Sequence, residues 1–161
     1  MSIEGIAAAA GVGKTTIYRR YPGKRDVVIA AISTLVATPT EPPDSGSTRE
    51  DLVDLIREML DLLFRTGIGY SMIGTLLVKE REEPMLIQLF REHVIQPRYR
   101  LVSSVLRRGV ERGELRSDLD PAVVLPMMIG STFARHLAGL PEDDEWLNEM
   151  VDAMWSGIAA P

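Results

Sequence analysis

The chain has 161 residues with a net charge of −5, of which 45% are hydrophobic and 25% charged. The length suits one medium domain or a small domain fused to a larger one, and the hydrophobic content allows a proper core. The negative net charge argues against a protein that coats nucleic acid with its whole surface. The absence of cysteine excludes disulfides and cysteine-based zinc sites, and two isolated histidines, His93 and His136, argue against a metal site, so we expect no metal and no cofactor.

Short helices are expected at the start of the chain. Residues 1–10 are rich in alanine and end at Gly11, which suits the left-handed stop of a helix. A second helix is expected over residues 13–21, ended by Pro22 and Gly23, and a third over residues 24–36. Residues 38–48 contain three prolines and no apolar periodicity, and they form a linker.

Longer amphipathic helices are expected after the linker. Ser47 or Thr48 can cap the first of them, and Asp120 caps a later one. Pro97 and Pro126 fall inside helical patterns and predict kinks. No alternating run predicts a strand, so the fold class is all-α. The expected ranges are 48–66, 70–81, 84–113, 121–138 and a last helix that opens at 141.

The start of the chain has the pattern of a helix-turn-helix. Ala7 permits close approach of a second helix, and Gly11 supplies a positive φ at the turn. We expect Ile6, Ala10, Val12 and Ile17 to fill the wedge between the helices. The second helix presents hydroxyls and cations, as contact with phosphates and base edges requires. The candidate DNA-binding residues are Lys14, Thr15, Thr16, Tyr18, Arg19 and Lys24.

The charge distribution agrees with this interpretation. Residues 1–32 carry five basic and two acidic side chains, a net charge of +3, and the remainder carries 13 basic and 21 acidic ones, a net charge of −8. A basic head on an acidic body predicts phosphate contact by the head alone, although chance scatter of surface charge also produces such asymmetry. The N-terminus lacks the features of a secretion signal, and the longest apolar stretch is too short to span a bilayer, so we expect a cytoplasmic protein.

Residues 6–24, which read IAAAAGVGKTTIYRRYPGK, resemble the DNA-binding segment of the TetR family of transcriptional regulators. That segment typically reads I-A-x-x-A-G-V-S-x-x-x-(L/I)-Y-x-(H/Y)-F-x-x-K, so Gly13 replaces a serine and Tyr21 a phenylalanine. The close match ends near residue 35, beyond which only the helix layout agrees. Members of the family have a further helix before this motif. Because this sequence starts only a few residues before the motif, we expect that helix to be missing.

The resemblance implies two domains and two further sites. Residues 1–37 would be the DNA-binding head, and residues 48–161 an effector-binding and dimerisation domain. The expected effector is small and mostly apolar, since the candidate lining residues carry few charges. They are Met59, Leu63, Phe64, Tyr70, Met72, Leu76, Phe90, His93, Val94, Met127 and Phe133. Methionines of this kind are more often simply part of the core. The last two helices would pair across a two-fold axis through Ile129, Gly130, Phe133, Leu137, Trp146, Met150, Met154 and Trp155, the last of which also suits the intrachain core.

The leading hypothesis is a homodimeric, ligand-responsive transcriptional repressor that binds a palindromic operator. The alternative is a helical ligand-binding or dimerisation module that has lost DNA binding with the first helix. A third hypothesis, a nucleotide hydrolase, depends on a relaxed phosphate-loop pattern at Ala8 to Thr15. A phosphate loop requires a strand before it, but the residues before Gly13 are expected to form an alanine-rich helix. The sequence also lacks a pair of nucleophile and base residues that would indicate another kind of enzyme.

Overall fold

A computed structural model describes residues 2–35, 41–61 and 68–160 of the chain. Its helices confirm the all-α fold class, and within the described ranges the only β-type pairing is an isolated bridge between Leu115 and Ala159. The helical elements are α1 (Ile3–Ala9), α2 (Lys14–Arg20), α3 (Lys24–Leu35), α4 (Thr48–Met59), α5 (Ile68–Lys79), α6 (Pro84–Phe90), the π-helical turn η2 (Arg91–Ile95), α7 (Gln96–Glu111), α8 (Pro121–Leu137) and α9 (Asp144–Ile158).

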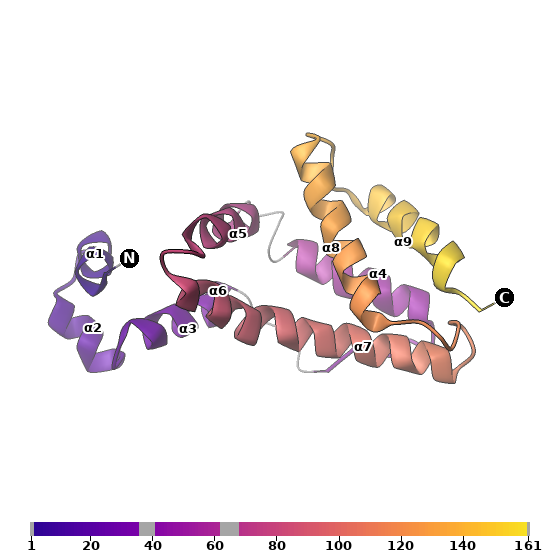
Figure 1. Ribbon diagram of the computed structural model, residues 1–161, viewed down its shortest axis with the longest axis horizontal. Helices are drawn as coiled ribbons and strands as arrows, with labels where there is room; N and C mark the ends of the chain where they lie inside the picture. Colours follow the sequence, from indigo (N-terminus) through magenta and orange to yellow (C-terminus); the bar gives the residue numbers. More distant parts are fainter. Residues whose placement is uncertain (1, 36–40, 62–67, 161) are drawn as a thin grey trace.

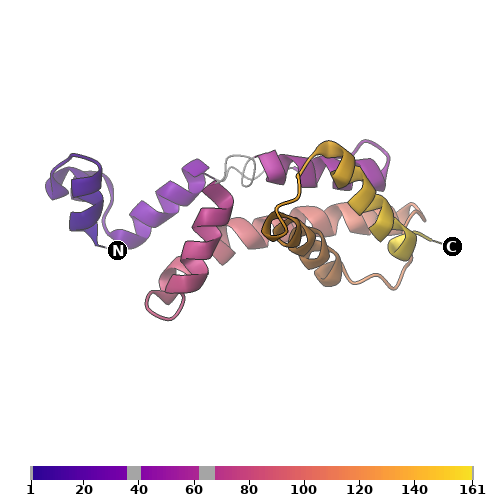
Figure 2. The ribbon, with the colours of Figure 1, turned by 90° about the horizontal axis from the view of Figure 1, so that it is seen from above.

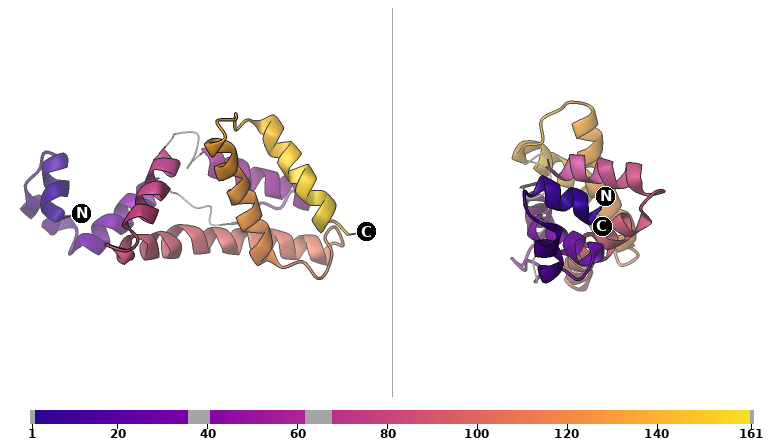
Figure 3. Two further views of the ribbon diagram at one scale, coloured as in Figure 1. Left: turned by 45° about the horizontal axis from the view of Figure 1, so that its top comes forward. Right: turned by 90° about the vertical axis from the view of Figure 1, so that its left-hand side faces the viewer.

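The molecule is elongated, with the N-terminal helices at one end and α9 at the other (Figure 1). The run α6–η2–α7 extends along the body, and α3 packs on α6 and η2 (Figure 2). At the far end, α4 packs on α7 and α9, while α8 crosses α7 (Figure 3). The α6–η2–α7 run therefore contacts α3 of the N-terminal part at one end and α4 and α8 at the other.

Two hydrophobic clusters hold this arrangement. The larger one runs from α3 to α9, and its fully buried members include Leu52, Leu89, Leu106 and Leu147. The smaller cluster lies between α1 and α2 and consists of Ile3, Ala7 and Ile17. The first three helices thus have a core of their own and contact the body mainly through α3.

Among the described helices, α1, α4, α8 and α9 begin at a side-chain cap. The Ser47 hydroxyl accepts a hydrogen bond from the Glu50 N–H (3.4 Å), and the Asp120 carboxylate accepts one from the Ala122 N–H (2.9 Å). Both predicted caps are confirmed. The last helix begins at Asp144 rather than 141, because Asp143 caps it by accepting from the Trp146 N–H. The predicted end of the helix over 48–66 lies outside the described residues.

The interruption expected at Pro97 takes the form of a π-helical turn. Proline has no N–H, so the carbonyl of His93 loses its usual partner four residues later. The Gln96 N–H instead bonds the Arg91 carbonyl, five residues back, and closes the wider turn η2. The chain then continues as α7, so that the predicted helix over 84–113 is observed as α6, η2 and α7.

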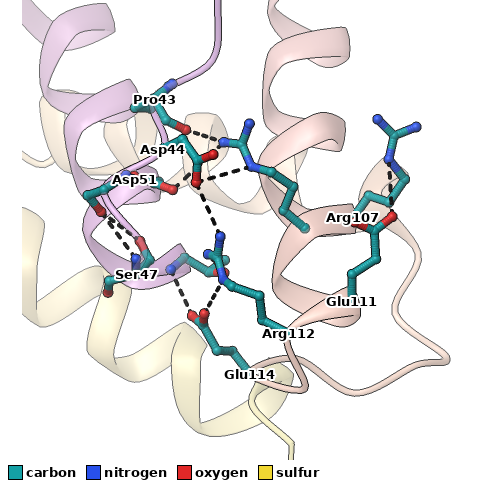
Figure 4. Close-up of polar contacts among 11 residues, drawn as sticks. Pro43, Asp44, Ser47, Asp51, Arg107, Glu111, Arg112 and Glu114 are labelled. Carbon is teal, nitrogen blue, oxygen red and sulfur yellow. Dashed lines mark hydrogen bonds and ion pairs between the residues drawn. The ribbon is translucent and has the colours of Figure 1, made fainter.

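A polar network joins the segment before α4 to the end of α7 (Figure 4). Arg112 donates to the Thr48 hydroxyl (2.7 Å), pairs with Asp44 (3.3 Å) and bonds Glu114. Burial alone would raise the pKa of Glu114, but hydrogen bonds from Thr48 and Arg112 outweigh it and lower that pKa. Gly109 makes this contact close, because a Cβ there would lie only 2.5 Å from the Thr48 hydroxyl oxygen.

Candidate functional site

The turn between α1 and α2 has the geometry predicted from its glycine. Gly11 adopts φ +66°, which only glycine adopts without strain. Its N–H bonds the Ala8 carbonyl (3.2 Å), and the Val12 N–H bonds the Ala7 carbonyl (3.0 Å). These bonds close the end of α1 and redirect the chain into α2, as a helix-turn-helix requires.

The residues that fill the wedge are only partly those predicted. Ile17 is buried and Ile6 half-buried, but Ala10 and Val12 are exposed, so their assignment to the wedge was wrong. Ile3 and Ala7 take that place, because they lie one turn apart on the face of α1 that meets Ile17.

The opposite face of α2 is open to solvent. Ile17 anchors the helix from beneath, and the side chains around it point away from the core. Tyr18 is 50% exposed, and its hydroxyl is free to meet a phosphate from outside. Arg20 is exposed, as are all the predicted DNA-binding residues of this helix: Lys14, Thr15, Thr16, Tyr18 and Arg19.

Lys24 differs from the other DNA-binding candidates, because its ammonium group is already paired within the chain. It donates to the carboxylate of Glu83, which directly precedes α6. This bond lowers the pKa of Glu83 to about 2. Arg25 pairs with Glu92 of η2 at 3.1 Å. The first turn of α3 is thus fastened to the body by two ion pairs.

The phosphate-loop alternative is not compatible with the fold. The segment before Gly13 is helix α1, and no strand is present in the described part of the chain. Without a strand, the backbone N–H groups of Gly13 to Thr15 do not form the loop that surrounds a phosphate chain.

Among the described residues, the predicted effector-binding residues are found at several places in the body. Met59 lines a pocket between α4, α7 and α8. Tyr70, Phe133 and His136 form an aromatic cluster between α5 and α8, in which the rings of Tyr70 and His136 stack with centroids 3.5 Å apart. Burial and hydrogen bonding to Glu142 raise the pKa of Tyr70 above its ordinary value.

The other predicted lining residues are spread over the body. Leu76, Phe90 and Val94 are buried in the main core, and Met72 is half-buried against it. His93 is exposed, and Met127 lies at a hollow between α8 and α9. Leu63 and Phe64 fall outside the described residues. The composition of the effector site therefore stays a prediction.

Sequence reasoning missed the two charged residues of the α4/α7/α8 pocket. Arg98 is only 7% exposed, and Glu58 lies beside it on α4. Burial lowers the pKa of Arg98, against an opposing attraction from Glu58, and burial likewise raises the pKa of Glu58. The remaining lining residues are apolar: Leu55, Ile56, Met59, Leu101, Val102 and Leu125.

The predicted dimerisation residues come from α8 and α9 and differ in how far they are exposed. Leu137 is 84% exposed and Met127 55% exposed, and Gly130 is also open to solvent. A hollow lined by Met127, Met150 and Met154 runs between the two helices. Ile129, Phe133, Trp146 and Trp155 are half-buried against the core of their own chain. The pairing of these helices across a two-fold axis stays a prediction.

Two other features are absent from the described residues, a membrane-spanning helix and a metal site. None of the helices described here is long and apolar enough to cross a membrane. Across residues 2–35, 41–61 and 68–160, no three side chains among histidine, aspartate and glutamate come together in a way that could hold a metal ion.

Comparison with known proteins gives matches over both halves of the chain. Residues 1–31 match the model of the bacterial regulatory proteins of the tetR family, and residues 42–154 match the tetracyclin repressor-like C-terminal domain. An uncharacterized HTH-type transcriptional regulator of Mycobacterium bovis is 31% identical over 118 residues, which are 73% of this chain and 56% of that protein. The chain thus spans little more than half the length of this relative.

Two further similarities extend over nearly the whole chain. The DNA-binding transcriptional repressor TetR of Mycobacteroides abscessus is 28% identical over 154 residues, 94% of this chain and 79% of that protein. The crystal structure of the TetR family transcription regulator SCO0332 superposes with a TM-score of 0.68 at 27% identity and covers 97% of this chain and 86% of that one.

Proposed function

Because the chain belongs to the TetR family of bacterial regulatory proteins, we propose that it is a DNA-binding transcriptional regulator. Residues 1–37 act as the head that contacts DNA, and residues 48–161 as the effector-binding and dimerisation domain. The observation that carries the proposal is the exposed basic and hydroxyl-bearing face of α2, held outward by the burial of Ile17 beneath it.

The regulator works as a homodimer on a palindromic operator. The support for this is the apolar surface of α8 and α9, which includes Met127 and Leu137 and resembles half of a four-helix bundle. Two copies related by a two-fold axis place two α2 helices in successive major grooves, roughly 34–36 Å apart. The operator is then an inverted repeat, since each half-site meets the same residues.

Binding of a small molecule to the body changes the affinity for DNA. The ion pairs of Lys24 with Glu83 and of Arg25 with Glu92 support this part, because they connect the head to the α6–η2–α7 run that also borders the α4/α7/α8 pocket. A ligand that favours one placement of α6 shifts the population of head positions. We assign the role of a repressor, which is also the printed role of the relative from Mycobacteroides abscessus.

The test is titration onto a labelled random-sequence duplex at about 50 and about 200 mM KCl, read by fluorescence anisotropy. Wild-type protein is expected to bind with a steep loss of affinity at the higher salt. The variant Lys14→Gln/Arg19→Gln should bind weakly, with a salt slope that falls by about 0.9 for each phosphate contact removed.

The matched control is Arg107→Gln/Arg116→Gln, which removes two exposed cations from the body. This variant should bind like wild type. If no binding is measurable at low salt, the proposal is wrong and the chain is a helical ligand-binding or dimerisation module. Equal losses in both double variants would show that net charge, and not the face of α2, determines binding.

A further inference from the structure

Ile17 determines how α2 is oriented about its own axis. It is the one buried residue of this helix, and it packs on Ile3 and Ala7 of α1. Successive residues of an α-helix are about 100° apart, so the positions two before and two after Ile17 lie roughly 160° from it. Thr15 and Arg19 hold these positions. They therefore form the middle of the outer face of α2, opposite the core of the head.

Thr15 and Arg19 also act at the same level of the helix. They lie four residues apart, and the Cα–Cβ bonds of a helix tilt toward its N-terminus, so the long Arg19 side chain leans over the turn that carries Thr15. In a helix-turn-helix, the N-terminal residues of the second helix contact base edges in the major groove. The guanidinium group of Arg19 thus reaches the part of α2 that enters the groove.

Arg19 has no partner within its own chain. Its helix lies at one end of the elongated molecule (Figure 1). The residue is exposed, and within residues 2–35, 41–61 and 68–160 it makes no hydrogen bond, ion pair or ring contact. By contrast, Lys24 and Arg25 are paired with carboxylates of the body. Arg20 lies over the ring of Tyr21, with its guanidinium carbon 5.8 Å from the ring centroid. The donors of Arg19 are thus available to acceptors outside the chain.

The other cations of α2 lie on its flanks. Lys14 and Arg20 stand three positions before and three after Ile17, which places them roughly 60° from it, one on each side. Phosphates border the major groove on both sides, so cations on the flanks meet the DNA backbone, whereas the middle of the outer face meets the base edges. Arg20, which sequence reasoning did not assign to DNA, is therefore a flanking residue and Arg19 a central one.

We infer that Arg19 determines the base specificity of the head and that it binds a guanine in each half-site of the operator. Its planar guanidinium group donates two parallel hydrogen bonds, which match the acceptors O6 and N7 of guanine in the major groove. Adenine has a donor where guanine has O6, and cytosine and thymine lack N7. This inference rests on the proposed DNA binding and adds to it the base that the operator must contain.

The experiment compares the duplexes that wild type and Arg19→Gln select from a random pool. Wild type should enrich half-sites with a guanine at one fixed position. Glutamine pairs with N6 and N7 of adenine, so Arg19→Gln should enrich half-sites with adenine at that position. The matched control is Arg20→Gln, which removes the same group from the flank of the helix. It should enrich the wild-type sequence and bind it less tightly.

Replacement of a single atom of the DNA measures the contact itself. The base 7-deazaguanine has carbon in place of N7, so it still pairs with cytosine but offers arginine one acceptor fewer. Wild type and Arg20→Gln should prefer guanine to adenine at the fixed position by roughly 5- to 150-fold, and 7-deazaguanine should remove most of this preference. Arg19→Gln should bind duplexes with guanine and with 7-deazaguanine equally. Because Arg19 and Arg20 are exposed, both variants should fold like wild type, which circular dichroism checks.

The outcomes separate this inference from the proposed function. If wild type enriches a site without a fixed guanine, or if Arg19→Gln enriches the same site as wild type, the inference is overturned and the proposed DNA binding stands. An unchanged affinity for 7-deazaguanine would likewise overturn it and assign Arg19 to a phosphate. A wild-type chain that binds no duplex at low salt would instead overturn the proposed function, and the inference with it.

Discussion

Lys24 is placed between two anions, the phosphate that it would meet on DNA and the carboxylate of Glu83. The bond to Lys24 lowers the pKa of Glu83 to about 2, so the carboxylate is ionised at every pH at which the protein works. The contribution of this pair to stability is complete above the ordinary pKa of 4.5 and is lost as the pH falls from there through about 2. Near neutral pH the pair therefore competes with DNA.

Glu83→Gln is expected to raise the affinity for DNA, because it releases Lys24 to bind a phosphate. The salt slope should steepen by about 0.9 for each head that gains a contact. Anisotropy titration at several salt concentrations measures both effects. The control is Glu82→Gln, which removes the same charge from an exposed neighbour paired with Lys79. An equal gain in both variants would contradict specific competition for Lys24.

Tyr18 is assigned to phosphate contact, and its replacement should therefore not change base preference. Tyr18→Phe removes the hydroxyl and leaves the ring, so that binding should weaken on all duplexes alike, by a free energy of roughly 0.5–1.5 kcal/mol. Titration onto a panel of duplexes of different sequence measures this. A change confined to some sequences would instead assign Tyr18 to a base edge.

At the scale of the helix, Gly109 determines how closely α4 approaches α7. Gly109→Ala improves helix propensity but places a methyl group 2.5 Å from the Thr48 hydroxyl oxygen, so it should lower the free energy of unfolding by about 1–3 kcal/mol. Gly74→Ala is the matched control, since nothing lies near the added group in α5. That change should raise the free energy of unfolding by roughly 0.5–1 kcal/mol. Urea unfolding measures both changes. If the two substitutions changed the free energy of unfolding in the same direction, the packing argument would be contradicted.

Local chemistry made most helices predictable. Ser47 and Asp120 cap helices through their own side chains, and Gly11 ends α1 with a backbone conformation that other residues avoid. The π turn was not predictable in this way, because the pattern around Pro97 predicts an interruption of the helix but not that it takes the form of a π turn.

The candidate sites were less predictable, because they depend on contacts distant in sequence. The ion pair of Lys24 with Glu83 joins residues that are 59 positions apart, and no local sequence pattern predicts it. Arg98 did carry a signal. It continues the spacing of the buried Phe90, Val94 and Leu101, so a cation stands where the helical stripe predicts an apolar residue.

For the whole molecule, the central prediction on assembly is a dimer through α8 and α9. Met127→Glu/Leu137→Glu places charges on the exposed apolar surface and should convert the dimer into monomers of 17.8 kDa in analytical ultracentrifugation. Leu77→Glu/Val78→Glu changes two equally exposed apolar residues of α5 and should leave the dimer intact. A wild-type chain that sediments as a monomer at micromolar concentration would contradict the assembly.

The central claim is that the exposed face of α2 reads DNA, and selection from a pool of random duplexes tests it most directly. Wild-type protein should enrich an inverted repeat whose half-sites are centred about 10–10.5 base pairs, or a multiple of this, apart. Thr15→Ala/Arg19→Ala should lose or alter the enriched sequence, because it changes side chains at the base edges. Enrichment of nothing above the starting pool by wild type, or of the same sequence by both proteins, would contradict the account.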